Sequence, residues 1–228
     1  MVTGGFGALG RAIGDALLAS GAQVALVDQA PAPAAASLPE GALACGSVDL
    51  CDQHAARRCL DGVAERFGGL DGIVNAAGGF AWESVEHGDI ATWERMYAMN
   101  VRTALLASQA ALPHLLRQGR GRIVNIGAMA AGRAQAGMGA YAAAKSGVAR
   151  LTEAMAEEFL DRGITINAIL PSIIDTPANR AAMPDADTSS WVAPAALAKV
   201  VQFLLSDASA AVTGALLPVS AAPAKATS

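Results

Sequence analysis

A tyrosine and a lysine four residues apart are the best candidates in this sequence for proton transfer. Tyr141 and Lys145 stand at the start of a long stretch with helical spacing, and positions four apart lie on the same face of a helix. A free phenol has a pKa of about 10, and a nearby ammonium group favours the phenolate and so lowers that pKa. The pair therefore predicts general acid/base chemistry beside a hydride transfer. A helix that carries both residues by chance is the alternative.

A glycine-rich turn near the N-terminus could bind a dinucleotide. Gly4, Gly7 and Gly10 precede a helical stretch, and such a turn lets the backbone and the helix N-terminus approach a pyrophosphate. Asp28 ends the next apolar run. A carboxylate there accepts hydrogen bonds from the adenosine ribose and repels a 2′-phosphate, which favours NAD(H) over NADP(H). A plain strand–helix turn and a turn-forming aspartate are the alternatives.

Two further polar segments follow apolar runs. Val48-Asp49-Leu50 closes the expected third strand region, and Asn75-Ala76-Ala77-Gly78 follows the fourth. In an open parallel sheet, ligands bind outside the carboxyl ends of the strands. We therefore expect both segments to lie beside the glycine turn.

Short apolar runs alternate with helical stretches along the whole chain, which predicts an α/β fold with a parallel sheet and crossover helices. The expected strands are Gln23–Val27, Ala42–Gly46, Gly72–Asn75, Arg122–Ile126, Thr165–Ile169 and Ala215–Val219. The expected helices are Ala8–Ser20, Gln53–Phe67, Ile90–Met99, Val101–Arg117, Tyr141–Arg162 and Pro194–Leu205.

The first strand is expected to be unusually short. Only Met1 and Val2 precede Thr3, where the glycine turn begins. Either this strand is truncated, or the recorded start lies downstream of the natural one. Residues 1–220 are expected to form one domain, with a loop at Ala30–Leu38 and a frayed tail at residues 221–228.

Composition narrows the classes of function. The chain has 228 residues, of which 53% are hydrophobic and 16% charged, and a net charge of −4. These values suit one compact α/β domain and disfavour a nucleic-acid partner. We expect a cytoplasmic protein without a membrane span, because the sequence has neither a long apolar stretch nor a secretory signal. The three cysteines (Cys45, Cys51 and Cys59) are expected to be free thiols, and no metal site is expected.

In their order, these motifs resemble the short-chain dehydrogenase/reductase family over nearly the whole chain. The resemblance implies a Rossmann-type, three-layer α/β/α sandwich around a doubly wound parallel sheet of about seven strands, in the order 3-2-1-4-5-6-7. It is carried by Gly4, Gly7, Gly10, Asp28, Asp49, Asn75–Gly78, Asn100, Gly121–Ile126, Tyr141, Lys145 and Pro171 to Thr176.

The family also implies roles for individual residues. Tyr141 would be the general acid/base, Lys145 would hold the nicotinamide ribose, and Asn100 would position a water in the proton relay. Ile174 and Thr176 would contact the nicotinamide carboxamide. The full set expected to bind the cofactor is Gly4, Phe6, Gly7, Ala8, Leu9, Gly10, Asp28, Asp49, Leu50, Asn75, Ala76, Ala77, Gly78, Tyr141, Lys145, Pro171, Ile174 and Thr176.

Two residues depart from the family pattern. Ala8 replaces a common glycine, which should shift the turn only slightly. Ala128 stands where most members have a serine that hydrogen-bonds the substrate oxygen, and loss of such a donor commonly costs about 10²–10³ in rate. The enzyme is then feeble, or Gln135 or Ser172 supplies another donor, or the substrate does not need that donor.

The sequence therefore predicts an NAD(H)-dependent oxidoreductase that acts on a small molecule. Family resemblance implies a homodimer or homotetramer. Local resemblance to dihydropteridine reductases, at Gly4–Gly10, Gly127–Ala131 and Leu170–Arg180, suggests reduction of a quinonoid dihydropterin as one alternative. An NAD-binding sensor or scaffold with little catalysis is the other. The segment Ser172–Ala193 is expected to be a turn-rich substrate lid.

Overall fold

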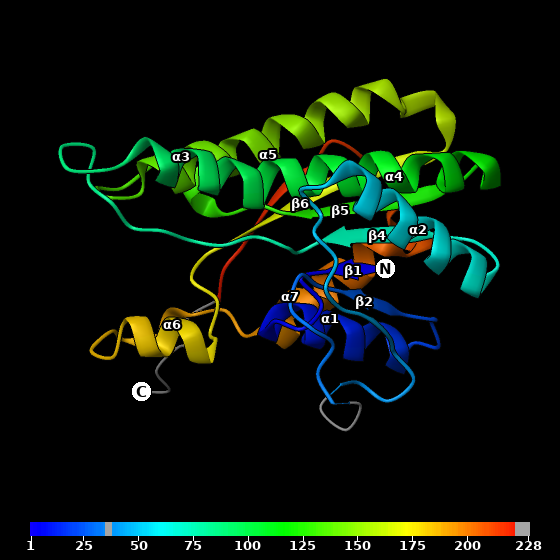
Figure 1. Ribbon diagram of the computed structural model, residues 1–228, viewed down its shortest axis with the longest axis horizontal. Helices are drawn as coiled ribbons and strands as arrows, with labels where there is room; N and C mark the ends of the chain where they lie inside the picture. Colours follow the sequence, from blue (N-terminus) through cyan, green and yellow to red (C-terminus); the bar gives the residue numbers. More distant parts are fainter. Residues whose placement is uncertain (35–37, 222–228) are drawn as a thin grey trace, which may run out of the picture.

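A seven-stranded parallel sheet forms the middle layer of the protein in the computed structural model, which describes residues 1–34 and 38–221 (Figure 1). Its strand order, β3-β2-β1-β4-β5-β6-β7, confirms the expected fold class. The strands are β1 (Val2–Thr3), β2 (Ala25–Val27), β3 (Leu43–Cys45), β4 (Gly72–Asn75), β5 (Gly121–Ile126), β6 (Ile164–Pro171) and β7 (Leu216–Val219).

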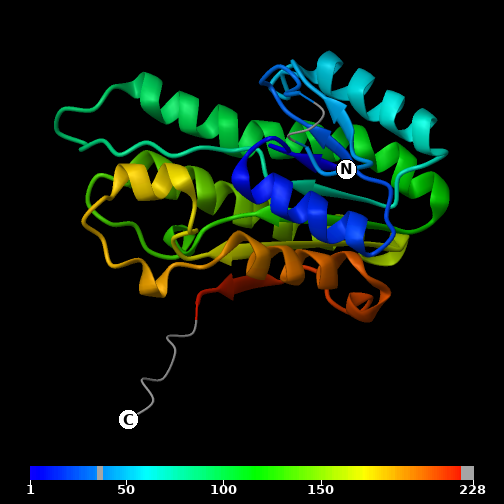
Figure 2. The ribbon, with the colours of Figure 1, turned by 90° about the horizontal axis from the view of Figure 1, so that it is seen from below.

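Helices cover both faces of the sheet (Figure 2). Helices α1 and α7 pack together on one face, and α2, α4 and α5 lie on the other. The helices are α1 (Ala8–Ala19), α2 (Gln53–Phe67), α3 (Ile90–Tyr97), α4 (Thr103–Gln118), α5 (Gly139–Glu158), α6 (Pro177–Ala182) and α7 (Pro194–Leu205). No helix in the described part of the chain is long and apolar enough to cross a membrane.

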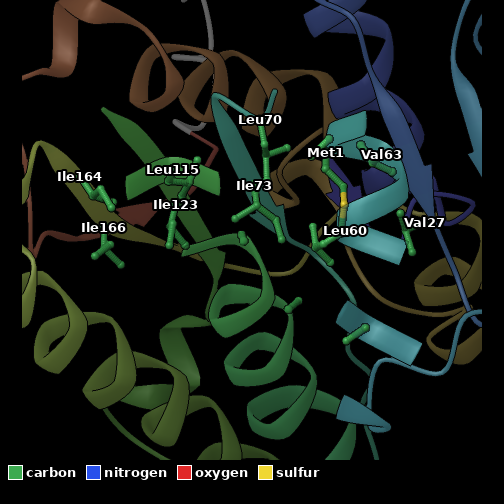
Figure 3. Close-up of a cluster of buried hydrophobic side chains, with 14 of the residues drawn as sticks. Met1, Val27, Leu60, Val63, Leu70, Ile73, Leu115, Ile123, Ile164 and Ile166 are labelled. Carbon is green, nitrogen blue, oxygen red and sulfur yellow. The ribbon is translucent and has the colours of Figure 1, made fainter. Parts of the chain in front are cut away.

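Successive residues of each strand enter opposite layers of the core. Ile73 and Ile123 pack towards α2 and α4, whereas their neighbours Val74 and Val124 pack towards α1 and α7. Figure 3 shows the first of these clusters, in which Leu60 of α2 lies with Ile73. Since both faces of the sheet are buried, the strands are mostly apolar, and the asparagines within them, Asn75, Asn125 and Asn167, are buried as well.

The first strand has only two residues but occupies the centre of the sheet. Val2 is in register with Leu26 of β2 and with Val74 of β4, parallel to both. The main chain continues the pairing one residue earlier, because the Val74 N–H donates to the Met1 carbonyl at 2.9 Å. Because β1 ends where the glycine turn begins, the glycine turn lies at the carboxyl edge of the sheet.

Four expectations about local structure differ from the structure. The helices expected at Ile90–Met99 and Val101–Arg117 are joined without a break, since a π-helical turn over Ala98–Arg102 links α3 to α4. Such a turn accommodates an extra residue without ending the helix. Val48-Asp49-Leu50 does not close the third strand, which ends at Cys45; Ser47, with φ of 59°, turns the chain before it.

The third correction concerns the expected lid. Helix α6 forms within it because Thr176 caps the first turn, its hydroxyl accepting from the Asn179 N–H at 3.2 Å, and Pro177 suits the first helical position. The expected helix Tyr141–Arg162 starts earlier, at Gly139, and ends at Glu158 before a separate 3₁₀ turn. Residues 35–37 of the expected loop and residues 222–228 of the expected tail lie outside the described residues.

Candidate active site

A cavity of about 720 Å³ opens at the carboxyl edge of β1, β2 and β4. It brings together most of the residues expected to bind the cofactor: Gly4, Gly7, Ala8, Leu9, Gly10, Asp28, Asp49, Leu50, Ala76, Ala77, Gly78 and Thr176. Val48, expected beside the glycine turn, also lines the cavity, and six lining residues were not expected from the sequence: Gln29, Cys51, Met99, Thr103, Pro177 and Ala178. Met99 and Thr103 reach the cavity from around the π-helical turn, which gave no clear sequence signal.

The glycine turn is closely packed and leaves the start of α1 open. Gly4 has φ of +60°, and a Cβ there would lie 2.8 Å from the Ala77 nitrogen. A Cβ on Gly10 would overlap the Gly4 carbonyl oxygen. The N-cap residue Gly7 offers no side-chain cap, and the first turn of α1 has no acidic residue. The first amides of α1 can therefore serve an anion in the cavity.

Asp28 is fixed at the end of β2 by the turn itself. Its Oδ2 accepts from the Phe6 N–H at 3.0 Å, and its Oδ1 accepts from the Ala30 N–H at 3.1 Å. The Asp28 N–H in turn donates to the Cys45 carbonyl at 3.0 Å. Phe6 thus positions the acid through its backbone and does not line the cavity.

Lys145 is buried, with 6% of its surface exposed, and its Nζ donates to the Ile126 carbonyl at 2.8 Å. Burial lowers the pKa of Lys145 to about 8. The same Nζ lies 5.9 Å from the ring centroid of Tyr141, so the expected meeting of phenol and ammonium does occur.

The expected lowering of the tyrosine pKa does not occur in the protein alone. Burial raises the pKa of Tyr141 to about 12. Desolvation penalises the charged phenolate, and the ammonium of Lys145 is already engaged by a backbone carbonyl. Tyr141 is consequently protonated at neutral pH.

Asn100 lies in the π-helical turn and joins the same group of residues. It is 1% exposed, and its Nδ2 donates to the Met96 carbonyl at 2.9 Å and to the Gly79 carbonyl at 3.1 Å. A Cβ on Gly78 would lie 2.6 Å from the Asn100 Oδ1 and 3.5 Å from the Lys145 Nζ. Asn100 and Lys145 therefore converge on the backbone of Gly78, at the rim of the cavity.

Six residues expected at the cofactor do not line the cavity: Phe6, Asn75, Tyr141, Lys145, Pro171 and Ile174. The Asn75 side chain is buried in the sheet, where its Nδ2 donates to the Ser108 Oγ at 2.9 Å and to the Asn125 Oδ1 at 2.8 Å. Pro171 ends β6, and Ile174 pairs with Val192. Their side-chain types alone could not distinguish residues that hold strands together from residues that face a ligand.

An aromatic ring packs against Tyr141, and two further large apolar side chains of the chain are exposed. The Phe80 ring meets Tyr141 edge-on, with centroids 5.0 Å apart. Trp82 is 66% exposed, and its Nε1 donates to the Ala136 carbonyl at 3.1 Å. Met129 is also exposed. Phe80 thus gives Tyr141 an apolar neighbour, whereas Trp82 packs against the segment around Ala136.

Hydroxyl donors are scarce near the reactive tyrosine. Ala128 is buried and offers only a methyl group. The Ser146 hydroxyl is used, donating to the Ala131 carbonyl at 2.7 Å. Gln135 is exposed. The Ser172 Oγ, just after β6, is buried without a hydrogen-bond partner in the described residues.

Among residues 1–34 and 38–221, no group of three or more His, Cys, Asp or Glu side chains could hold a metal ion. Two carboxylates, Asp28 and Asp49, line the cavity, and the Tyr141–Lys145 pair lies beside Gly78 at its rim.

The sequence matches the family model described as short chain dehydrogenase over residues 1–187. It is 35% identical over 237 residues to 2-(S)-hydroxypropyl-CoM dehydrogenase 3 of Xanthobacter autotrophicus, covering 96% of this chain and 93% of that protein. It is 36% identical over 220 residues to the protein named inactive 2-(S)-hydroxypropyl-CoM dehydrogenase 2 of the same organism, covering 90% and 96%.

Solved structures show the same architecture. Levodione reductase superposes with a TM-score of 0.87 at 30% identity, covering 96% of this chain and 94% of that one. NAD⁺-bound xylitol dehydrogenase superposes with a TM-score of 0.86 at 26% identity, covering 97% and 96%.

Proposed function

This chain belongs to the short-chain dehydrogenase family, and from that membership we propose that it is an NAD(H)-dependent oxidoreductase that interconverts a small secondary alcohol and its ketone. The observation that carries the proposal is the grouping of Tyr141, Lys145 and Asn100 beside Gly78, a residue that lines the cavity together with the glycine turn and Asp28. The relatives' names support the substrate class: one acts on a 2-hydroxypropyl group and one is a xylitol dehydrogenase.

The residues present fit a nicotinamide dinucleotide. The uncapped amides of α1 would hold the pyrophosphate, and the glycine positions that no Cβ could occupy keep the turn close to the strands. Asp28 would accept hydrogen bonds from the adenosine ribose and disfavour a 2′-phosphate. When bound, the nicotinamide supplies or accepts the hydride.

Tyr141 would hold and move the proton. With a pKa of about 12 in the protein alone, it is poised to donate its proton to a ketone oxygen in the reductive direction. In the oxidative direction the phenolate would accept the alcohol proton, and the charge of Lys145 would stabilise that phenolate.

Asn100 would position the backbone of Gly79, which it bonds through both ends of its amide. Its expected role in ordering a relay water stays a prediction. The Phe80 ring packs against Tyr141 and would help to exclude bulk water from the proton transfer.

A second candidate function is dinucleotide binding with little turnover. Two observations favour it: Ala128 removes the hydroxyl that most family members present to the substrate, and one relative is named inactive. Dihydropteridine reduction is an alternative for the substrate of the same NAD(H)-dependent oxidoreductase, in which an imine-like substrate would not require that hydroxyl.

Assembly and location are further expectations. A homodimer or homotetramer packed through α4 and α5 follows from family resemblance, and a cytoplasmic location stays a prediction. The free thiols of the described chain are compatible with it.

Cofactor choice tests the proposed site directly. Wild-type protein should turn over small secondary alcohols with NAD⁺ at a kcat/KM at least tenfold above that with NADP⁺. Asp28→Ala should raise KM for NAD⁺ and reduce the preference for NAD⁺ over NADP⁺, because the variant lacks the carboxylate that would bind the ribose and repel a 2′-phosphate. Measurements with NADH and either a ketone or a quinonoid dihydropterin would separate the two substrate classes.

Tight NADH binding without turnover of any of these substrates would favour the second function. Equal use of NAD⁺ and NADP⁺ by both proteins would contradict the role of Asp28.

A further inference from the structure

Two of the three cysteines lie side by side at the outer edge of the sheet. Cys45 belongs to the edge strand β3, and Cys59 lies on α2, which covers that strand. Both side chains line one pocket and pack against the same core cluster, and an interaction with the Cys59 thiol lowers the pKa of Cys45. Both residues are free and only partly buried. Cys51, by contrast, lines the cofactor cavity and donates to the Ala98 carbonyl at 3.4 Å.

The thiol pair opens onto a second pocket of about 510 Å³. This pocket has Val48 in common with the cofactor cavity, but neither Cys45 nor Cys59 lines that cavity. Two exposed arginines of α2, Arg58 and Arg66, line the second pocket. Their charges suit an anionic molecule, and the partial exposure of the thiols gives it access to sulfur.

We propose that Cys45 and Cys59 form a redox-active dithiol that a small anionic disulfide oxidises to a reversible intramolecular disulfide. The adjacency of the two side chains, the pocket beside them and its two arginines carry this inference. It does not depend on the proposed oxidoreductase function.

The exchange proceeds in two balanced steps. The Cys45 thiolate attacks one sulfur of the small disulfide, forming a mixed disulfide and releasing one small thiolate. Cys59 then loses its proton and attacks the Cys45 sulfur, forming the Cys45–Cys59 bond and releasing the second small thiolate. The protein loses two electrons and two protons, and the small disulfide is reduced to two thiols.

The interaction between the two thiols sets the order of attack. It lowers the pKa of Cys45 to about 7 and raises the pKa of Cys59. Cys45 is thus substantially ionised at neutral pH and is the attacking residue, since the thiolate is the nucleophile. Cys59 is the resolving residue, because it stays protonated until Cys45 is consumed.

The pair is also directly connected to the cofactor site. The Cys45 carbonyl accepts from the N–H of Asp28, and the Val48 N–H donates to the Asp28 carbonyl, both at 3.0 Å. A cross-link at Cys45 therefore acts on the strand end that positions Asp28.

Intact-mass spectrometry and peptide mapping after treatment with oxidised glutathione test the proposal. Reduced wild-type protein and the matched control Cys51→Ser should each lose two hydrogens at the pair, and dithiothreitol should reverse this. Cys59→Ser should instead retain one glutathione on Cys45, because the resolving thiol is missing.

Cys45→Ser should react at least tenfold more slowly at residue 59. Thermal melts of all variants establish that they are folded, and mapping of the wild-type disulfide does not depend on any variant. Thiols that stay free at Cys45 and Cys59, separate glutathione adducts on both, or a bond to Cys51 would each overturn the proposal.

Discussion

Burial affects the pKa values of Tyr141 and Lys145 more than the charge of Lys145 does. Residue types and spacing correctly predicted that Tyr141 and Lys145 lie close together. The predicted direction of the pKa shift of Tyr141 was wrong. The sequence could not reveal that the Lys145 ammonium would be buried and bonded to the Ile126 carbonyl. The same limit applies to Asn75, which points into the sheet although its type and position suited a ligand.

A substitution at Ala128 tests whether the missing hydroxyl group limits the turnover rate. Ala128→Ser restores a hydroxyl at a buried position close to the reactive segment, and it should raise kcat/KM for a secondary alcohol by roughly 10²-fold, the scale of one lost oxyanion donor. Steady-state kinetics with saturating NAD⁺ measures this. Ala130→Ser, which adds a hydroxyl two residues away, should change the value less than twofold. An unchanged rate in Ala128→Ser would show that the missing hydroxyl does not limit turnover.

Elements with strong local signals were predicted closely. The bounds of β4, α2 and α7 agree with the sequence expectation, because Asp52 caps α2, Gly68 ends it, and Pro194 starts α7. The π-helical turn and α6 were missed, since neither has a periodic apolar face long enough to be recognised. The π turn carries Asn100, for which we propose a role in the active site.

The close packing of the glycine turn predicts that a side chain at position 10 destabilises the protein. Gly10→Ala should destabilise the protein by about 1–3 kcal/mol, because a Cβ there overlaps the Gly4 carbonyl and forces the turn apart. Gly7→Ala is the matched control: its nearest contact would be 3.4 Å and its φ is −74°, so its effect should stay within about 0.5 kcal/mol.

Denaturant unfolding followed by circular dichroism measures both variants. Equal stability of Gly10→Ala and wild type would show that the turn tolerates a side chain, and would remove the packing argument for the phosphate site.

At the scale of the whole molecule, the order of elements predicted the architecture well. Parallel strands connected by helices place all carboxyl ends on one edge of the sheet, so the glycine turn, Asp28 and Gly78 meet there although they are distant in sequence. Side-chain direction, burial and the limits of the cavity could not be predicted, because they depend on contacts between elements. The division into one domain and a tail stays a prediction.

We propose that Tyr141 transfers the proton and that the cofactor site binds NADH without its help. The most direct measurement is ketone reduction at pH 7 by wild type and Tyr141→Phe, with NADH affinity measured in parallel by fluorescence titration. The variant keeps the ring that packs on Phe80 and should lose at least 10²-fold in kcat while binding NADH within about threefold of wild type. Turnover by Tyr141→Phe within twofold of a measurable wild-type rate would contradict the account.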